Sequence, residues 1–137
     1  MGGFCHPGYL VACQLPRRHT STLVTYRNKK IMIDCGEDWL DQLRAVAPDA
    51  IVITHAHPDH AFGLARGAPC PVYAIQKAWT KLKDFPVGQS NRRTLAIRRV
   101  EKIAGVRFEP FFCRPFNKGP SSGISDPGWN GCSLLRA

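Results

Sequence analysis

Three of the five histidines in this 137-residue chain lie within one stretch of seven residues, Thr-His-Ala-His-Pro-Asp-His at positions 54–60. The apolar run Ala-Ile-Val-Ile at positions 50–53 leads directly into it and is typical of a buried strand. His55 and His57 follow that strand at i and i+2, so alternation places both imidazoles on one side. The sequence therefore predicts a cluster of histidines at the edge of a sheet.

Pro58 suits the first turn of a helix, which would fold Asp59 and His60 back towards the same edge. We therefore predict a metal site formed by His55, His57, Asp59 and His60. Imidazole nitrogen and carboxylate oxygen suit zinc, and also manganese or iron. The site would hold one ion, or two if other segments add ligands. The predicted chemistry is hydrolytic: the metal activates water, while Asp59 orients that water and receives its proton.

Chance and a helix cap are the two alternatives to a metal site for this cluster. At this chain's own residue frequencies, the pattern His-x-His-x-Asp-His is expected by chance in roughly 3 of 10,000 such sequences. In a helix cap, Asp59 would lie near the helix N-terminus and the histidines would be hydrogen-bonded to backbone. His6 and His19 stand alone and are interpreted as surface residues.

The central part of the chain alternates between strand patterns and helix patterns, which predicts an α/β fold. Two β-rich runs separated by a polar turn predict a hairpin, and apolar residues at helical spacing predict two helices. The predicted strands are 23–26, 31–33, 50–53, 71–74 and 106–109, and the predicted helices are 37–46, a short one from Pro58, and 75–83.

The length of the chain is that of one domain. Residues 1–19 are irregular, 20–110 carry the α/β pattern, and 111–137 form a tail rich in Pro, Gly and Ser that we expect to be poorly ordered. No apolar run approaches the roughly 18 residues of a membrane span, and the start of the chain does not resemble a secretory signal. We therefore expect a cytoplasmic protein that does not bind membranes.

The six cysteines are scattered without a CxxC pair, so we expect them to be reduced. Cys35 follows a predicted strand directly and is interpreted as buried packing rather than as a catalytic thiol.

The formal charge of +9 is unevenly distributed. Six of the ten acidic residues lie between positions 34 and 59, whereas eight basic residues lie between positions 77 and 102. A basic segment of this kind attracts RNA, DNA or a phosphorylated substrate. A solvated helix face is the favoured interpretation, because aromatic residues are not interleaved for base stacking.

The stretch His55-Ala56-His57-Pro58-Asp59-His60 resembles the His-X-His-X-Asp-His signature of the metallo-β-lactamase-fold hydrolases. The preceding hairpin, the turn Asp34-Cys35-Gly36-Glu37 and the continuation Phe62-Gly63-Leu64 are also similar to that family. The similarity extends over about residues 20–83. It implies an αβ/βα sandwich.

By position, the resemblance implies that His55 and His57 bind a first metal ion, and that Asp59 and His60 bind a second. Asp59 would also assist the attacking water. Asp34 resembles the aspartate that steadies the ligand loop by hydrogen bonding in that family, although a buried structural carboxylate fits the sequence equally well.

Members of the family normally have a further histidine, a bridging aspartate and a final histidine downstream. In this chain no histidine follows His60, and the later aspartates are Asp84 and Asp126. We therefore expect only the first half of the sandwich, with a tail altered by truncation, splicing or a shifted reading frame. A sheet face without its second half must meet water, the tail or a partner, which predicts self-association as a homo-oligomer.

The favoured functional prediction is a metal-dependent hydrolase acting on a small-molecule or nucleic-acid phosphodiester, or on another ester-type bond. One alternative is a catalytically inactive metal-binding remnant or interaction module, because the downstream ligands are missing. The other is a basic nucleic-acid-binding module, which the net charge alone supports.

Overall fold

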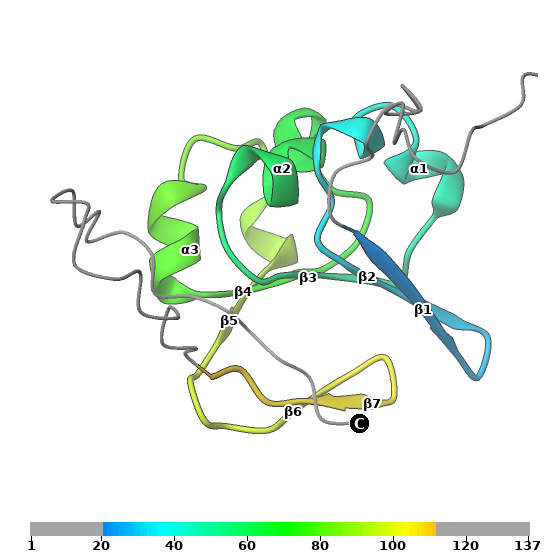
Figure 1. The fold of residues 1–137 in the computed structure, drawn as a ribbon, viewed down its shortest axis with the longest axis vertical. Coiled ribbons are helices and arrows are strands. Elements are labelled where there is room, and N and C mark those ends of the chain that lie inside the picture. Colours follow the sequence, from blue (N-terminus) through cyan, green and yellow to red (C-terminus); the bar gives the residue numbers. More distant parts are fainter. Residues whose placement is uncertain (1–20, 112–137) are drawn as a thin grey trace, which may run out of the picture.

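The computed structural model describes residues 21–111. A five-stranded sheet in the order β1-β2-β3-β4-β5 forms its centre (Figure 1). Strands β1 and β2 are antiparallel, and β2 to β5 run parallel. A separate pair of antiparallel strands, β6 and β7, follows. The strands are β1 (Thr22–Tyr26), β2 (Lys29–Ile33), β3 (Ala50–Ile53), β4 (Val72–Ile75), β5 (Arg92–Leu95), β6 (Glu101–Ile103) and β7 (Val106–Phe108).

Helices connect the parallel strands, as parallel pairing requires. They are α1 (Leu43–Val46), α2 (Pro58–Ala61) and α3 (Gln76–Lys81), with the 3-10 turns η1 (Glu37–Trp39), η2 (Phe62–Arg66) and η3 (Gln89–Asn91). Figure 1 shows the three α-helices on one face of the sheet and the β6–β7 pair beyond the other. The mixed α/β fold predicted from the sequence is confirmed.

The predicted hairpin is present, and its turn is tighter than expected. Tyr26 pairs with Lys29, which leaves Arg27 and Asn28 as a two-residue turn with φ of 45° and 62°. Two successive positive φ values are the geometry of the I′ turn that suits the right-handed twist of a hairpin. The turn therefore fixes the register of β1 on β2.

The face of the sheet away from the helices is partly covered by the β6–β7 pair. Ile103 and Phe108 are at most 1% exposed and belong to the same hydrophobic core as β2, β3 and β4. Val24, Ile33 and Tyr73 pack against that core and stay partly exposed. The sequence prediction for this face named water, the tail or a partner. The β6–β7 pair precedes the tail and is a cover that the prediction missed.

The prediction of one helix over residues 37–46 is wrong. The chain forms η1, a turn, and then the four-residue α1. Leu40 and Gln42 donate backbone hydrogen bonds to residues three positions earlier, which is the tighter 3-10 pattern. Two short turns in place of one helix allow Trp39 to reach Ser21 by a 2.7 Å hydrogen bond while Leu43 enters the core.

The interpretation of the basic segment as one helix face is also wrong. Helix α3 ends at Lys81, and strands β5 and β6 follow within the segment. Strand β5 escaped prediction because two arginines hide its pattern. Arg92 lies over the Trp79 ring at 5.1 Å and donates to the carbonyls of Lys83, Phe85 and Val87, so its charge is used inside the fold.

Residues 1–20 and 112–137 lie outside the described part of the chain, and the expectations for both ends lie there with them. The division at 1–19, 20–110 and 111–137 stays a prediction. None of the helices within residues 21–111 has the length and apolar character that crossing a bilayer requires. The cytoplasmic location stays a prediction.

Candidate metal centre

Strand β3 delivers the histidine loop to the edge of the sheet. All four of its residues are buried, and it is paired in parallel with β2 on one side and β4 on the other. Helix α2 then begins at Pro58, directly after His57, and buries Ala61. The loop is therefore held at one end by the centre of the sheet and at the other by a buried helix residue.

His55, His57 and Asp59 converge within this loop. One ligand atom from each lies within 4.8 Å of the other two, and the rings of His55 and His57 are 4.9 Å apart between centroids. Two imidazole nitrogens and one carboxylate oxygen are a donor set that suits zinc, manganese or iron. The spacing predicted from alternation along β3 does bring these three side chains together.

His60 lies beside this group and is held from behind. Its ring packs against His55 at 3.7 Å between centroids, its Nδ1 is 2.8 Å from Asp34 Oδ2, and its Nε2 is 3.3 Å from Asp59 Oδ2. An imidazole nitrogen and a carboxylate oxygen that lie this close together can bind one metal cation between them. His60, the remaining predicted ligand, is thus close to Asp59.

Asp34 is the buried carboxylate of the described chain, only 3% exposed. Its Oδ1 accepts from the Thr54 backbone N–H at 2.8 Å, and its Oδ2 accepts from the Thr54 hydroxyl at 2.7 Å and contacts His60 Nδ1. The backbone of Asp34 has a φ of 58°. Asp34 therefore connects the end of β2 to both ends of the histidine loop, as the sequence resemblance implied.

Thr54 was missed by the prediction from sequence. Its hydroxyl lies between Asp34 and His55, 3.0 Å from His55 Nδ1. A hydroxyl directly before the first histidine was the only signal of this contact in the sequence. One part of the helix-cap alternative is present, because Asp59 lies in the first turn of α2. The cap residue itself is His57, and its side chain makes no capping hydrogen bond.

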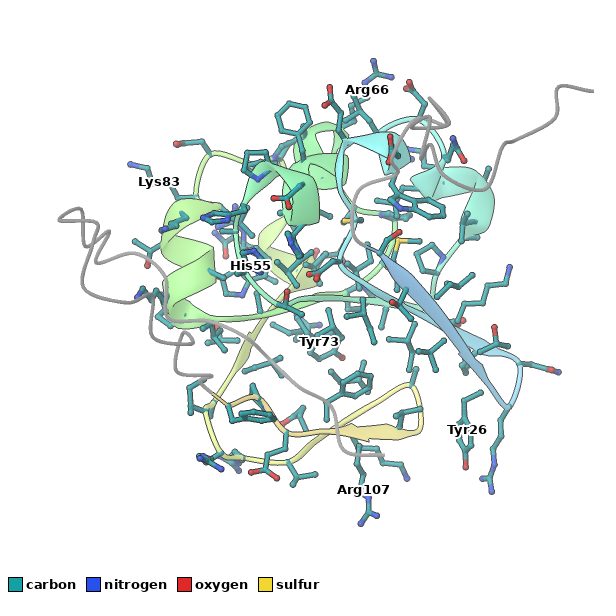
Figure 2. The ribbon with its side chains drawn as sticks, viewed as in Figure 1. Tyr26, His55, Arg66, Tyr73, Lys83 and Arg107 are labelled. Atoms are coloured by element: carbon teal, nitrogen blue, oxygen red, sulfur yellow. The ribbon has the colours of Figure 1, made fainter. Side chains whose placement is uncertain are left out.

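Burial lowers the pKa of His55, and the neighbouring His60 lowers it further. Desolvation disfavours the protonated ring, which favours the neutral form of His55 that can offer a lone pair. In Figure 2 His55 lies on the helix side of the sheet and Tyr73 on the opposite side. His55 is therefore on the helix-covered side of the sheet.

Cys35 lies next to Asp34 and is fully buried, as expected from the sequence. Burial, and to a lesser degree the charge of Asp34, raises the pKa of its thiol to about 12. A thiol of this kind carries almost no thiolate at neutral pH and acts as packing. Its backbone N–H donates to the carbonyl of His60 at 2.7 Å, which ties the turn to the loop.

A mostly parallel sheet whose central strand leads into clustered imidazole and carboxylate groups is an arrangement typical of α/β proteins that bind metal ions. The model of the metallo-β-lactamase superfamily matches residues 15–128. The chain belongs to the metallo-β-lactamase superfamily.

Curated relatives are similar over a shorter region. Ribonuclease Z of Alkaliphilus oremlandii is 41% identical over 56 residues, which is 36% of this chain and 18% of that protein. Ribonuclease Z of Bradyrhizobium diazoefficiens is 45% identical over 53 residues, 35% of this chain and 18% of that protein. The chain thus matches less than a fifth of the length of these relatives.

Solved structures show the same fold over more of the chain. A diphosphatase from the PhnP family is 27% identical with a TM-score of 0.57, covering 82% of this chain and 50% of that one. Zn(2+)-bound PqqB from Methylobacterium extorquens has a TM-score of 0.59 at 17% identity, covering 85% and 46%. The chain therefore spans about half the length of these two structures.

Proposed function

We propose that this chain is a metal-dependent hydrolase that acts on phosphodiester bonds. The observation that carries the proposal is the convergence of His55, His57 and Asp59, whose ligand atoms lie within 4.8 Å of one another. His55, His57, Asp59 and His60 hold the metal, with zinc as the preferred ion and manganese or iron as the other candidates.

A divalent ion bound there supplies Lewis-acid activation of water and of the scissile phosphate. Asp59 receives the proton of the attacking water. Its side chain is 51% exposed, so water reaches it, and its Oδ2 is held 3.3 Å from His60 Nε2. Asp34 orients the loop through Thr54 and His60.

Two similarities support a phosphodiester substrate. Four curated ribonuclease Z proteins besides those described above are also at least 40% identical over 50 residues or more of this chain. The diphosphatase from the PhnP family is a structural neighbour at 27% identity. The formal charge of +9 favours a phosphate-containing substrate, either a small molecule or a nucleic acid.

Turnover of a chromogenic phosphodiester by the metal-loaded full chain tests the proposal. The protein with zinc or manganese should release product, and the double variant His55→Ala, His57→Ala should bind no metal and show no turnover. The matched control is His6→Ala, His19→Ala, which removes two histidines outside the loop. Equal metal content in the two double variants, measured by elemental analysis, would reject the site.

A metal-binding module without catalysis is the second candidate. It is favoured by the small ligand group of the described chain and by the lack of any histidine after His60. Metal bound at His55 and His57 without metal-dependent turnover would select it. Salt-sensitive RNA binding that survives chelation would instead select the nucleic-acid-binding module. We also propose that the chain forms a homo-oligomer through the sheet face that lacks a second half. Light scattering measures whether it does.

A further inference from the structure

The hydroxyl of Thr54 is placed between a buried carboxylate and an imidazole. It is 2.7 Å from Asp34 Oδ2 and 3.0 Å from His55 Nδ1, and the Thr54 backbone N–H donates to Asp34 Oδ1 at 2.8 Å. The same Oδ2 is 2.8 Å from His60 Nδ1. One carboxylate thus touches one histidine ring directly and reaches a second through a hydroxyl.

The direction of these hydrogen bonds follows from counting protons. An ionised carboxylate only accepts, whereas a hydroxyl has one proton to donate and lone pairs to accept with. The short contact to Asp34 requires the Thr54 proton, because two oxygen lone pairs facing each other at 2.7 Å would repel. The hydroxyl oxygen then accepts, so the His55 contact requires a proton on Nδ1.

We propose that Thr54 is a positioning residue that carries the polarity of Asp34 to His55 and fixes that ring as the Nδ1–H tautomer. The lone pair of His55 is then on Nε2. By the direct contact, Asp34 holds the proton of His60 on Nδ1 as well. Both rings therefore have their proton on the Asp34 side before any metal arrives.

This arrangement differs from a general packing role for Thr54. A ring with its tautomer already set binds a metal without first moving a proton, and outer hydrogen bonds of this kind are worth about 10–100-fold in metal affinity. The consequence for affinity rests on the proposed function, whereas the tautomer itself is a property of the metal-free chain.

Nitrogen-15 NMR of the histidine rings in the metal-free full chain tests the proposal directly. At about pH 8, above the ordinary histidine pKa of about 6.5, a protonated and an unprotonated ring nitrogen of a neutral imidazole resonate far apart. His55 is expected to show the proton on Nδ1, with its signals assigned from a His55→Gln variant. A His55 ring with its proton on Nε2 in the unmodified chain would overturn the proposal without any Thr54 variant.

The variants Thr54→Val and Thr54→Ser separate the hydroxyl from the side-chain volume. Thr54→Val keeps the shape and the backbone hydrogen bond to Asp34, and it should release the His55 ring towards the Nε2–H form and weaken zinc binding about 10–100-fold. Thr54→Ser should restore both. An unchanged His55 tautomer in folded Thr54→Val contradicts the proposal.

Asp34→Asn makes a sharper prediction, because it should reverse the whole chain of hydrogen bonds. The Thr54 backbone N–H keeps the amide oxygen at the Oδ1 position, so the amide NH₂ replaces Oδ2 and donates to Thr54 and to His60 Nδ1. Thr54 must then donate to His55. Both rings should move their proton to Nε2, and a single-ring change would show that Thr54 does not transmit the polarity.

These results are distinguishable from those that test the hydrolase proposal. If the chain binds no zinc or turns over no phosphodiester, the tautomers and their response to Thr54→Val still decide this inference. Conversely, zinc binding and turnover with a His55 tautomer that ignores Thr54 would keep the hydrolase and remove the role of Thr54.

Discussion

The two sides of the histidine loop are built differently. The buried side consists of Asp34, Thr54 and the Nδ1 edge of His60, joined by hydrogen bonds of 2.7–2.8 Å across 20 to 26 residues of sequence. The open side consists of His57 and Asp59, and the Asp59 side chain is 51% exposed against 4% for Asp34. Two carboxylates of one site thus have opposite surroundings.

This difference indicates that the two carboxylates have different roles. A buried carboxylate surrounded by donors costs free energy if any partner is removed, so it holds the loop rigidly. An exposed carboxylate contributes little to folding and is available to ligands and to proton transfer. We therefore expect changes on the buried side to affect stability first, and changes on the open side to affect metal binding alone.

The largest expected effect is the protection of the Cys35 thiol behind the buried side. A pKa of about 12 against an ordinary 9.0 means about 1,000-fold less thiolate, so alkylation of Cys35 in the folded chain should be slower by about that factor. Cys70, with a pKa of about 11, should be protected about 100-fold. Peptide-resolved mass spectrometry after iodoacetamide treatment measures both, with the urea-unfolded chain as reference. Equal rates for Cys35 in the two states would show that the buried side opens readily.

Asp34→Ala should destabilise the fold by about 3 kcal/mol, because the Thr54 amide, the Thr54 hydroxyl and His60 Nδ1 all lose their acceptor. Urea unfolding followed by circular dichroism measures the loss. Asp49→Ala is the matched control, since Asp49 also accepts two hydrogen bonds, from Lys29 and Lys30, but at the surface. A loss no larger than that of the control would remove the distinction between the two sides.

Gly63→Ala should cost about 1–3 kcal/mol, since an added Cβ would lie 2.8 Å from the Cys35 carbonyl oxygen and 2.9 Å from that of Gly36. Both contacts are backbone and cannot move aside cheaply. Gly88→Ala is the control, because its Cβ would meet Ser90 Oγ at an ordinary 3.7 Å, and it should change stability by less than about 0.5 kcal/mol. Thermal unfolding measures both variants. Equal shifts of the unfolding temperature in the two would contradict close packing at Gly63.

Asp59→Asn should have the smallest effect on folding, within about 0.5 kcal/mol, because the side chain is half exposed. Its effect should appear as weaker zinc binding in a competition with a chelating dye. A variant that unfolds more easily yet binds zinc normally would place Asp59 on the structural side of the comparison.

The sequence predicted the open side better than the buried side. His55, His57 and Asp59 follow one strand within five positions, so alternation along β3 and the turn at Pro58 were enough to bring them together. The contact of Thr54 with Asp34 joins residues 20 positions apart through a parallel strand pair, and local patterns do not predict which distant carboxylate the Thr54 hydroxyl meets.

The same reasoning accounts for the errors in the fold. Strands with apolar runs, such as β3 and β4, were predicted because burial on both faces leaves a clear signal. Strand β5 has two arginines among four residues and is a strand because it pairs with β4, while Arg92 is satisfied by Trp79 and by backbone carbonyls. In that region tertiary contacts outweigh local propensity.

The position of Asp34 also sets an order for folding. Its partners lie 20 and 26 residues further along the chain, so the histidine loop cannot take its native shape until β2 and β3 have paired. Contacts across such separations form only after the entropy of closing the intervening segment has been overcome. A growing polypeptide therefore pairs β2 with β3 before the loop is ready for an ion, so a bound ion would stabilise a frame already in place instead of nucleating it.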